Sequence, residues 1–150
     1  MDIKKDKYII LEIIPTNYKS KSGVIIQISA LKIDGLTLIE RFDYRLKDDS
    51  LPIIELKELI NYDNNNFSYV DSEQDILNAF QKFCNNLPIF ILNDNYTKEF
   101  IEPFNENINY ILDYLGMDYS DDVIDKIIDK YHLEPSEHIV DLLYEALMMH

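Results

Sequence analysis

The stretch that most constrains the fold is residues 8–14, "YIILEII", an apolar run that only Glu12 interrupts and that Pro15 follows. So short a run, rich in isoleucine, predicts a central strand of a sheet that is buried on both faces. A carboxylate inside such a strand is costly unless a partner or a metal compensates its charge. The role of Glu12 is therefore the first question that the sequence raises.

The composition predicts one soluble globular domain over residues 1–150. Hydrophobic residues make up 47% of the chain, with 7 phenylalanines and 11 tyrosines among them. Chains of this length ordinarily form a single core. No run reaches the roughly 18 consecutive apolar residues that a membrane span needs, and the N-terminus lacks a secretory pattern. We therefore expect a cytoplasmic protein that does not bind membranes.

The charge balance argues against nucleic acid as the partner. The net charge is −14, whereas proteins that bind nucleic acid normally carry a basic surface that neutralises phosphates. The simplest interpretation is a solvated acidic surface that favours solubility. Two sharper interpretations stay open, namely a protein partner or an acidic decoy that mimics nucleic acid. The oligomeric state is not indicated.

The first third of the chain predicts three antiparallel strands. After the run at 8–14, "GVIIQISALKID" (23–34) alternates with period two, and "DG" at 34–35 is a strong hairpin signal. "LTLIERFDYRL" (36–46) then forms the third strand. The chain thus opens with an antiparallel meander.

Helical signals dominate the rest of the chain. A short helix is expected over 54–61, followed by an Asn-rich loop over 63–71, and Ser72 is a good N-cap for the next helix. "LPIFIL" (87–92) is a buried strand, and a broken helix is expected over 97–104. Residues 108–116 fit a strand or a helix. Two further helices are expected, with Ser120 and Ser136 as their N-caps. The fold class is therefore α/β, with a mixed five-stranded sheet and helices on both faces.

This order of elements resembles the DEDD-type 3′–5′ exonucleases of the RNase H-like fold, such as the proofreading domains similar to DNA polymerase III epsilon. "YIILEIIPTN" (8–17) is similar to the family's first strand, "hhhhDhETTG". "VIIQISALKIDG" (24–35) looks like its second strand, and "PIFILNDNYTKEFI" (88–101) looks like its "VAHNAxFDxxFL" segment. The resemblance covers nearly the whole chain, and no single motif is intact.

The resemblance implies a site for two-metal hydrolysis, in which four carboxylates bind the ions and a histidine takes the proton of the attacking water. The family's four acids correspond to Glu12, Ile14, Thr97 and Asp141, and its histidine to Ser136. Two acids therefore remain and the base is lost. His138 lies two positions further and, on a helix starting at Ser136, on another face. The positions Ile14, Thr97 and Ser136 make hydrolysis improbable.

Asp94 is the one acid that would rebuild a three-carboxylate site. It follows the strand at 87–92, so it would point toward Glu12 and Asp141. The simpler interpretation is a turn residue in "NDN". Asp141 likewise fits a solvated helix stripe, whereas Glu12 fits equally well as a metal ligand or as an acid that is bonded to a lysine or a helix N-terminus.

Three functions follow from these alternatives. The first is a degenerate exonuclease-fold domain, catalytically inactive, that binds a protein or regulates one, without a cofactor. The second is an active metal-dependent 3′–5′ exonuclease that uses Glu12, Asp94 and Asp141 with Mg²⁺ or Mn²⁺. The third is the acidic decoy of a basic protein.

Overall fold

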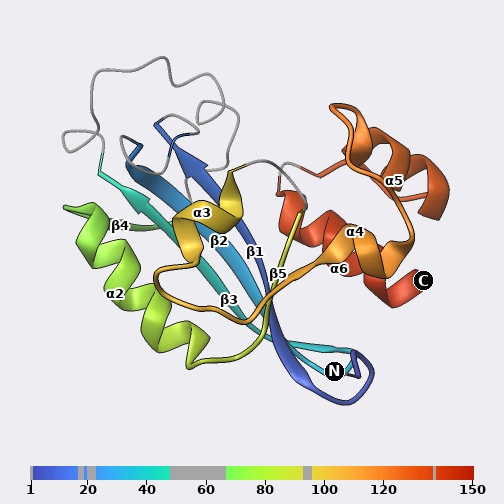
Figure 1. Ribbon diagram of the computed structural model, residues 1–150, viewed down its shortest axis with the longest axis horizontal. Coiled ribbons are helices and arrows are strands. Elements are labelled where there is room, and N and C mark those ends of the chain that lie inside the picture. The colour runs from blue at the N-terminus through green and yellow to red at the C-terminus, as the bar shows by residue number, and fades with distance from the viewer. Residues whose placement is uncertain (1, 17–18, 20–22, 48–66, 93–95, 137) are drawn as a thin grey trace.

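The fold is built on one mixed sheet, in the order β4-β3-β2-β1-β5-β6 (Figure 1). The computed structural model describes residues 2–16, 19, 23–47, 67–92, 96–136 and 138–150. The strands are β1 (Lys7–Pro15), β2 (Ile25–Asp34), β3 (Thr37–Leu46), β4 (Ser68–Val70), β5 (Ile89–Ile91) and β6 (Ile108–Tyr110).

Strand β1 lies inside the sheet and pairs on both sides. It is antiparallel to β2, which is antiparallel to β3, and parallel to β5. The tight turn between β2 and β3 contains Gly35 at a φ of 63°, and a Cβ there would lie 2.7 Å from the backbone oxygen of Lys4. Glycine suits this turn for both reasons. The expected antiparallel meander is confirmed.

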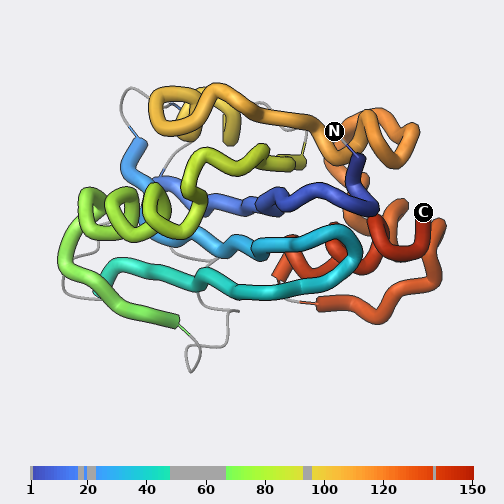
Figure 2. Tube along the Cα trace, turned by 90° about the horizontal axis from the view of Figure 1, so that it is seen from below, coloured from blue at the N-terminus to red at the C-terminus, as the bar shows by residue number. Residues whose placement is uncertain are grey.

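Helices cover both faces of the sheet, as expected. α2 (Glu73–Cys84) and α3 (Thr97–Ile101) pack on one face, whereas α4 (Ile111–Leu115), α5 (Val123–Tyr131) and α6 (Ile139–Met149) build the core on the other. Figure 1 shows α2 and α6 on opposite sides of the long strands. Figure 2 shows β1, β2 and β3 side by side, with both ends of the chain at one end of the molecule.

Helix α2 forms as its local sequence predicts. The Ser72 hydroxyl accepts a hydrogen bond from the Asp75 backbone N–H at 3.2 Å. The helix ends at Asn85, which adopts the left-handed conformation that a C-cap favours. Its buried face is the expected one: Ile76, Leu77, Phe80, Phe83 and Cys84.

The described sheet has six strands, one more than expected. Ser68–Val70, expected within a loop, forms β4 against the end of β3. Residues 108–116, which fit either a strand or a helix, contain both, because β6 leads directly into α4. The helix expected over 54–61 lies outside the described residues.

Two of the expected caps are wrong. The N-cap of α5 is Asp122 and the N-cap of α6 is His138, and neither side chain makes a capping hydrogen bond. The Ser120 hydroxyl instead donates to the Asp122 carboxylate at 2.7 Å, and the Ser136 hydroxyl accepts from the His138 backbone N–H at 3.2 Å. Among the described helices, none combines the length and apolar character that crossing a membrane requires.

Ser72→Ala is expected to lower the free energy of unfolding by about 1 kcal/mol, because it removes the hydroxyl that satisfies a helix N-terminal N–H. Ser120→Ala is the matched control and should change it by less than about 0.5 kcal/mol, since Ser120 is solvent-accessible and caps no helix. Urea unfolding of the three proteins measures both values. Equal losses in the two variants would contradict this assignment of caps.

Candidate functional site

Glu12 belongs to a buried row of polar side chains that crosses three strands. It lies opposite Ser29 of β2, which lies opposite Asp43 of β3. Directly paired residues present their side chains on the same face of a sheet. The exposed fraction of Glu12 is 8% and that of Ser29 is 0%, and the side chain of Asp43 is 8% exposed. The sheet therefore places two acids and a hydroxyl in one row on the face that α6 covers.

The Glu12 carboxyl lies at the start of α6. Its pKa is raised to about 8, first by burial and then by the negative charges of Asp141 and Asp43, against a hydrogen bond from the backbone of Ile139 that lowers it. At pH 7 this carboxyl is therefore mostly protonated. The contact with Ile139 agrees with the simpler interpretation of Glu12, an acid bonded to a helix N-terminus.

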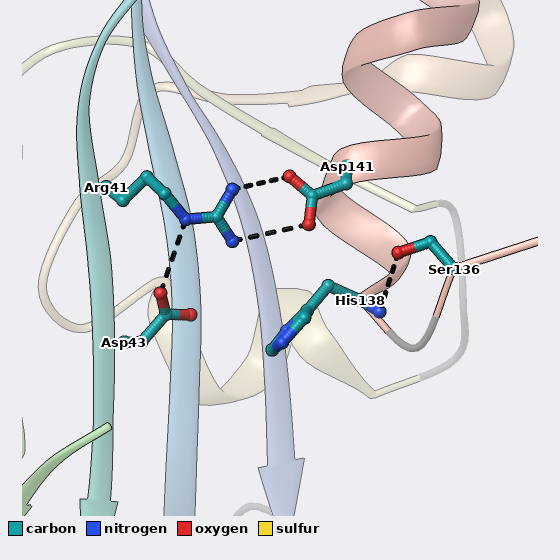
Figure 3. Close-up of polar contacts among 5 residues, drawn as sticks. All are labelled: Arg41, Asp43, Ser136, His138 and Asp141. Carbon is teal, nitrogen blue, oxygen red and sulfur yellow. Dashed lines mark hydrogen bonds and ion pairs between the residues drawn. The ribbon is translucent and has the colours of Figure 1, made fainter. Parts of the chain in front are cut away.

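Arg41 of β3 holds both neighbouring carboxylates (Figure 3). Its Nη1 donates to Asp141 Oδ1 at 2.5 Å and its Nη2 donates to Asp141 Oδ2 at 3.3 Å. Its Nε lies 3.5 Å from Asp43 Oδ2. The hydrogen bond to Asp141 is the largest influence on the pKa of Arg41 and raises it above its already high value. The guanidinium is thus a permanent positive charge between two carboxylates.

Glu12 and Asp141 lie close enough for the charge of Asp141 to raise the pKa of Glu12. Asp141 is 29% exposed and bound to Arg41, so it is more than part of a solvated stripe. Ile14 is buried in the apolar core on the α2 side. Thr97 is buried at the first position of α3, and Asp94 lies outside the described residues.

The start of α6 corrects one argument from the sequence. Ser136 is exposed and precedes the helix. His138 is the N-cap residue and not a position on a helix face, so the expectation that it faces away from the site fails. Its ring points toward the strands (Figure 3), and it lines the same cleft as Asp43 and Asp141.

This cleft has a volume of about 1200 Å³. It lies beside β3, with α2 on one side and the start of α6 on the other. Its charged walls carry both signs, from Lys32, Glu40, Arg41, Asp43, Asp75, Lys82 and Asp141. Such a cleft is suited to a polar partner, because it presents groups of both charges.

The described residues do not fit the two divalent ions that the exonuclease fold implies. Among them, no group of three or more His, Cys, Asp or Glu side chains is placed to hold a metal ion. Both oxygens of Asp141 face the Arg41 guanidinium, whose positive charge repels a cation. Ile14 and Thr97 offer no carboxylate, so the described part of the chain does not present the oxygen ligand set that Mg²⁺ prefers.

Sequence reasoning missed Arg41 and Asp43. The segment "RFDYR" (41–45) alternates charged and aromatic residues, which indicates a strand with one polar face. This alternation indicates that Arg41 and Asp43 share one face of the strand. It does not indicate that Asp43 lies in the same row as Glu12. The position depends on the register of β3 against β2, where a bulge between Lys32 and Ile33 shifts the pairing.

The fold is similar to that of solved exonuclease I structures. Apo exonuclease I matches over 96% of this chain and 41% of its own, with 12% identity and a TM-score of 0.60. The zinc-bound E. coli exonuclease I complex with single-stranded DNA matches over 96% and 39%, with 12% identity and a TM-score of 0.59. Product-bound exonuclease I matches over 96% and 42%, with 14% identity and a TM-score of 0.57.

These likenesses establish the mixed α/β, RNase H-like fold. The chain spans about two fifths of the length of the exonuclease I chains that it matches. No protein-family model matches the chain, and no curated protein does.

Glu12→Gln is expected to stabilise the protein at pH 8 and to leave it nearly unchanged at pH 4. In the folded state the carboxyl keeps its proton up to about pH 8, whereas the ordinary value is 4.5. The folded state therefore binds more protons between these values, and wild-type stability falls as pH rises through that window. Since one pH unit corresponds to about 1.4 kcal/mol, the gain at pH 8 should be on the order of a few kcal/mol.

Urea unfolding at pH 4, 6 and 8 in the presence of EDTA measures this difference. Glu145→Gln, an exposed acid on α6, is the control and should change stability by less than about 0.5 kcal/mol at each pH. A Glu12→Gln effect of the same size and sign at pH 4 and pH 8 would show that the buried carboxyl is ionised in the folded protein.

Proposed function

We propose that this chain is an exonuclease-fold domain that has lost hydrolysis and acts as a protein-binding or regulatory module. The observation that carries the proposal is the bidentate contact of Arg41 with Asp141. The resemblance to the exonucleases assigns Asp141 to the position of their last metal ligand, and in this chain the Arg41 guanidinium already binds Asp141. A divalent ion would have to displace a charge-assisted pair of hydrogen bonds, which are among the stronger polar contacts in proteins.

The charge of the chain supports a protein partner in preference to nucleic acid. With a net charge of −14, phosphates approach against long-range repulsion. The cleft beside β3 carries charges of both signs, which suits a polar protein surface. Exonuclease I also occurs in complexes, with SSB in one structure and with SSB-Ct in another. A domain of this fold is therefore compatible with a role in protein binding.

The runner-up is an active exonuclease with an altered site on Glu12, Asp94 and Asp141. The proximity of Glu12 and Asp141 favours it, because their charges influence each other. The Arg41 guanidinium argues against an active site, since it neutralises the charge of Asp141. The acidic-decoy alternative rests on the net charge alone.

The protein is expected to leave 3′-ended single-stranded DNA and RNA intact in the presence of Mg²⁺ or Mn²⁺, because its described carboxylates are not placed to hold these ions. Denaturing gels of end-labelled oligonucleotides measure the loss, with E. coli exonuclease I as the positive control. Metal-dependent shortening from the 3′ end by the wild-type protein, abolished in Glu12→Ala and in Asp141→Asn, would establish the runner-up instead.

Binding of labelled single-stranded DNA should be weaker than a Kd of about 10⁻⁴ M at physiological salt, the weak limit of ordinary non-specific binding. Fluorescence anisotropy across a salt series measures it. The expected absence of saturation follows from charge repulsion. Saturable binding below that limit, weakening steeply with salt, would mean that a local basic surface overrides the net charge and that nucleic acid is the partner.

A further inference from the structure

Strand β4 covers only part of the β3 edge of the sheet. It pairs with Tyr44, Arg45 and Leu46 at the end of β3, and β3 has no other neighbour on this side among the described strands. The preceding part of β3, residues 37–43, is therefore an open edge within the described part of the chain. The backbone N–H and C=O groups along such an edge can pair with another extended chain.

The hydrogen bonds of β3 show which backbone groups face outward at this edge. The N–H of Lys47, just after β3, donates to the C=O of Val70 in β4 at 2.9 Å, so it points away from β2. This orientation alternates along an antiparallel strand. Arg41 and Asp43 therefore direct their N–H groups outward as well, whereas Phe42 directs its N–H toward β2.

A bulge limits the length of chain that this edge can accept. The pairing of β3 with β2 skips Ile39, since Leu38 lies opposite Ile33 and Glu40 lies opposite Lys32. Bulges and charged side chains shield sheet edges from extended pairing with other chains. The regular part of the open edge thus spans residues 40–43, between the bulge and β4, and it fits a short segment.

This edge lies in the cleft beside β3, whose lining includes residues 40–44 together with residues of α2 and α6. The α2 side of the cleft is aromatic. The ring of Phe42 stacks on Tyr44 with centroids 4.3 Å apart and lies 5.1 Å from the ring of Phe83. The other side carries the ion pair of Arg41 with Asp141. A strand added between these sides would alternate its side chains between them.

The charges of the cleft favour a basic segment. Arg41 is already paired with Asp141, and the Lys32 ammonium lies 3.5 Å from the Glu40 carboxylate. Among the ion pairs of the described residues, none includes Asp75 of α2, which also lines the cleft. Asp75 is therefore available to a basic side chain, and the net charge of −14 attracts such a segment over longer distances.

We propose that β3 binds an extended, basic segment of a partner protein, which adds to residues 40–43 as a short strand. The inference rests on the proposed protein-binding function and adds the surface and the chemistry of the partner. The backbone of the segment pairs with Arg41 and Asp43, its apolar side chains pack on the aromatic side of the cleft, and a basic side chain reaches Asp75. Backbone hydrogen bonds provide affinity in this binding mode, and side chains provide specificity.

Fluorescence anisotropy at physiological salt tests binding with a labelled short peptide that alternates lysine and valine. We expect saturable binding. The same peptide with two adjacent central amides N-methylated should bind at least about tenfold more weakly, because one of two adjacent N–H groups must face β3. A peptide with glutamate in place of lysine should not saturate, because the protein repels it. Equal affinity of the methylated peptide, or no saturation by the lysine peptide, would overturn the proposal.

Two substitutions on α2 should change the affinity for the lysine peptide in opposite directions. Asp75→Lys should weaken it at least about threefold, and Lys82→Glu should strengthen it by a similar factor, because both side chains line the cleft. Asp129→Lys is the matched control, an exposed acid on α5, which lies across the molecule from α2 (Figure 1). It should change the affinity by less than about twofold, since salt screens distant charges. Equal weakening by Asp129→Lys and Asp75→Lys would contradict the site.

Amide hydrogen exchange, measured by NMR, locates the added strand. Saturation with the lysine peptide should slow exchange of the Arg41 N–H at least about tenfold, because this group gains an acceptor. The Phe42 N–H already faces β2 and should change by less than about twofold. Unchanged exchange at Arg41 in the saturated protein would exclude strand addition.

The nuclease assay separates this inference from the proposed function. Hydrolysis of a 3′-ended strand by the wild-type protein would refute the proposed loss of activity. A protein that neither hydrolyses nucleic acid nor binds the lysine peptide would refute only the docking site on β3.

Discussion

The position of β1 at the centre of the sheet is the constraint on which the rest of the site depends. Strand β1 pairs with β2 on one side and with β5 on the other, and Glu12 is buried within it. The carboxyl must therefore find its partners within the protein. The start of α6 supplies a backbone hydrogen bond from Ile139, and β3 brings Asp43 and Arg41 to the same face. The position of α6 over the sheet therefore determines which groups surround Glu12.

The protein compensates the acids around Glu12 in two different ways. Glu12 keeps its proton, because burial and two neighbouring negative charges raise its pKa to about 8. Asp141 and Asp43 stay beside a guanidinium, which is charged at every physiological pH. An uncompensated buried charge costs several kcal/mol, and neither device needs an ion from outside. The charges of these acids are therefore compensated within the protein. A metal-binding site differs, because its carboxylates need a bound cation to compensate their charge.

The sequence predicted those parts of the fold that local chemistry determines. The meander of β1, β2 and β3 followed from alternation and the turn at Gly35, and α2 followed from Ser72 and its apolar face. The short strands β4 and β6 were harder, because three residues carry little periodicity and their pairing depends on neighbours distant in sequence. Resemblance to exonucleases pointed to Glu12 and Asp141. It could not reveal Arg41, because its contact with Asp141 joins residues 100 positions apart.

A structural role accounts for the acid at position 12. The N-cap of α6 is His138, whose side chain makes no capping hydrogen bond. Helix N-termini leave backbone N–H groups that need an acceptor, and the Glu12 carboxyl provides one from a neighbouring strand. A protonated carboxyl still accepts through its carbonyl oxygen, so the contact requires no negative charge. Isoleucine at position 14 instead packs into the core. Glu12 thus has a function in folding through its contact with the start of α6, and Ile14 belongs to the apolar interior.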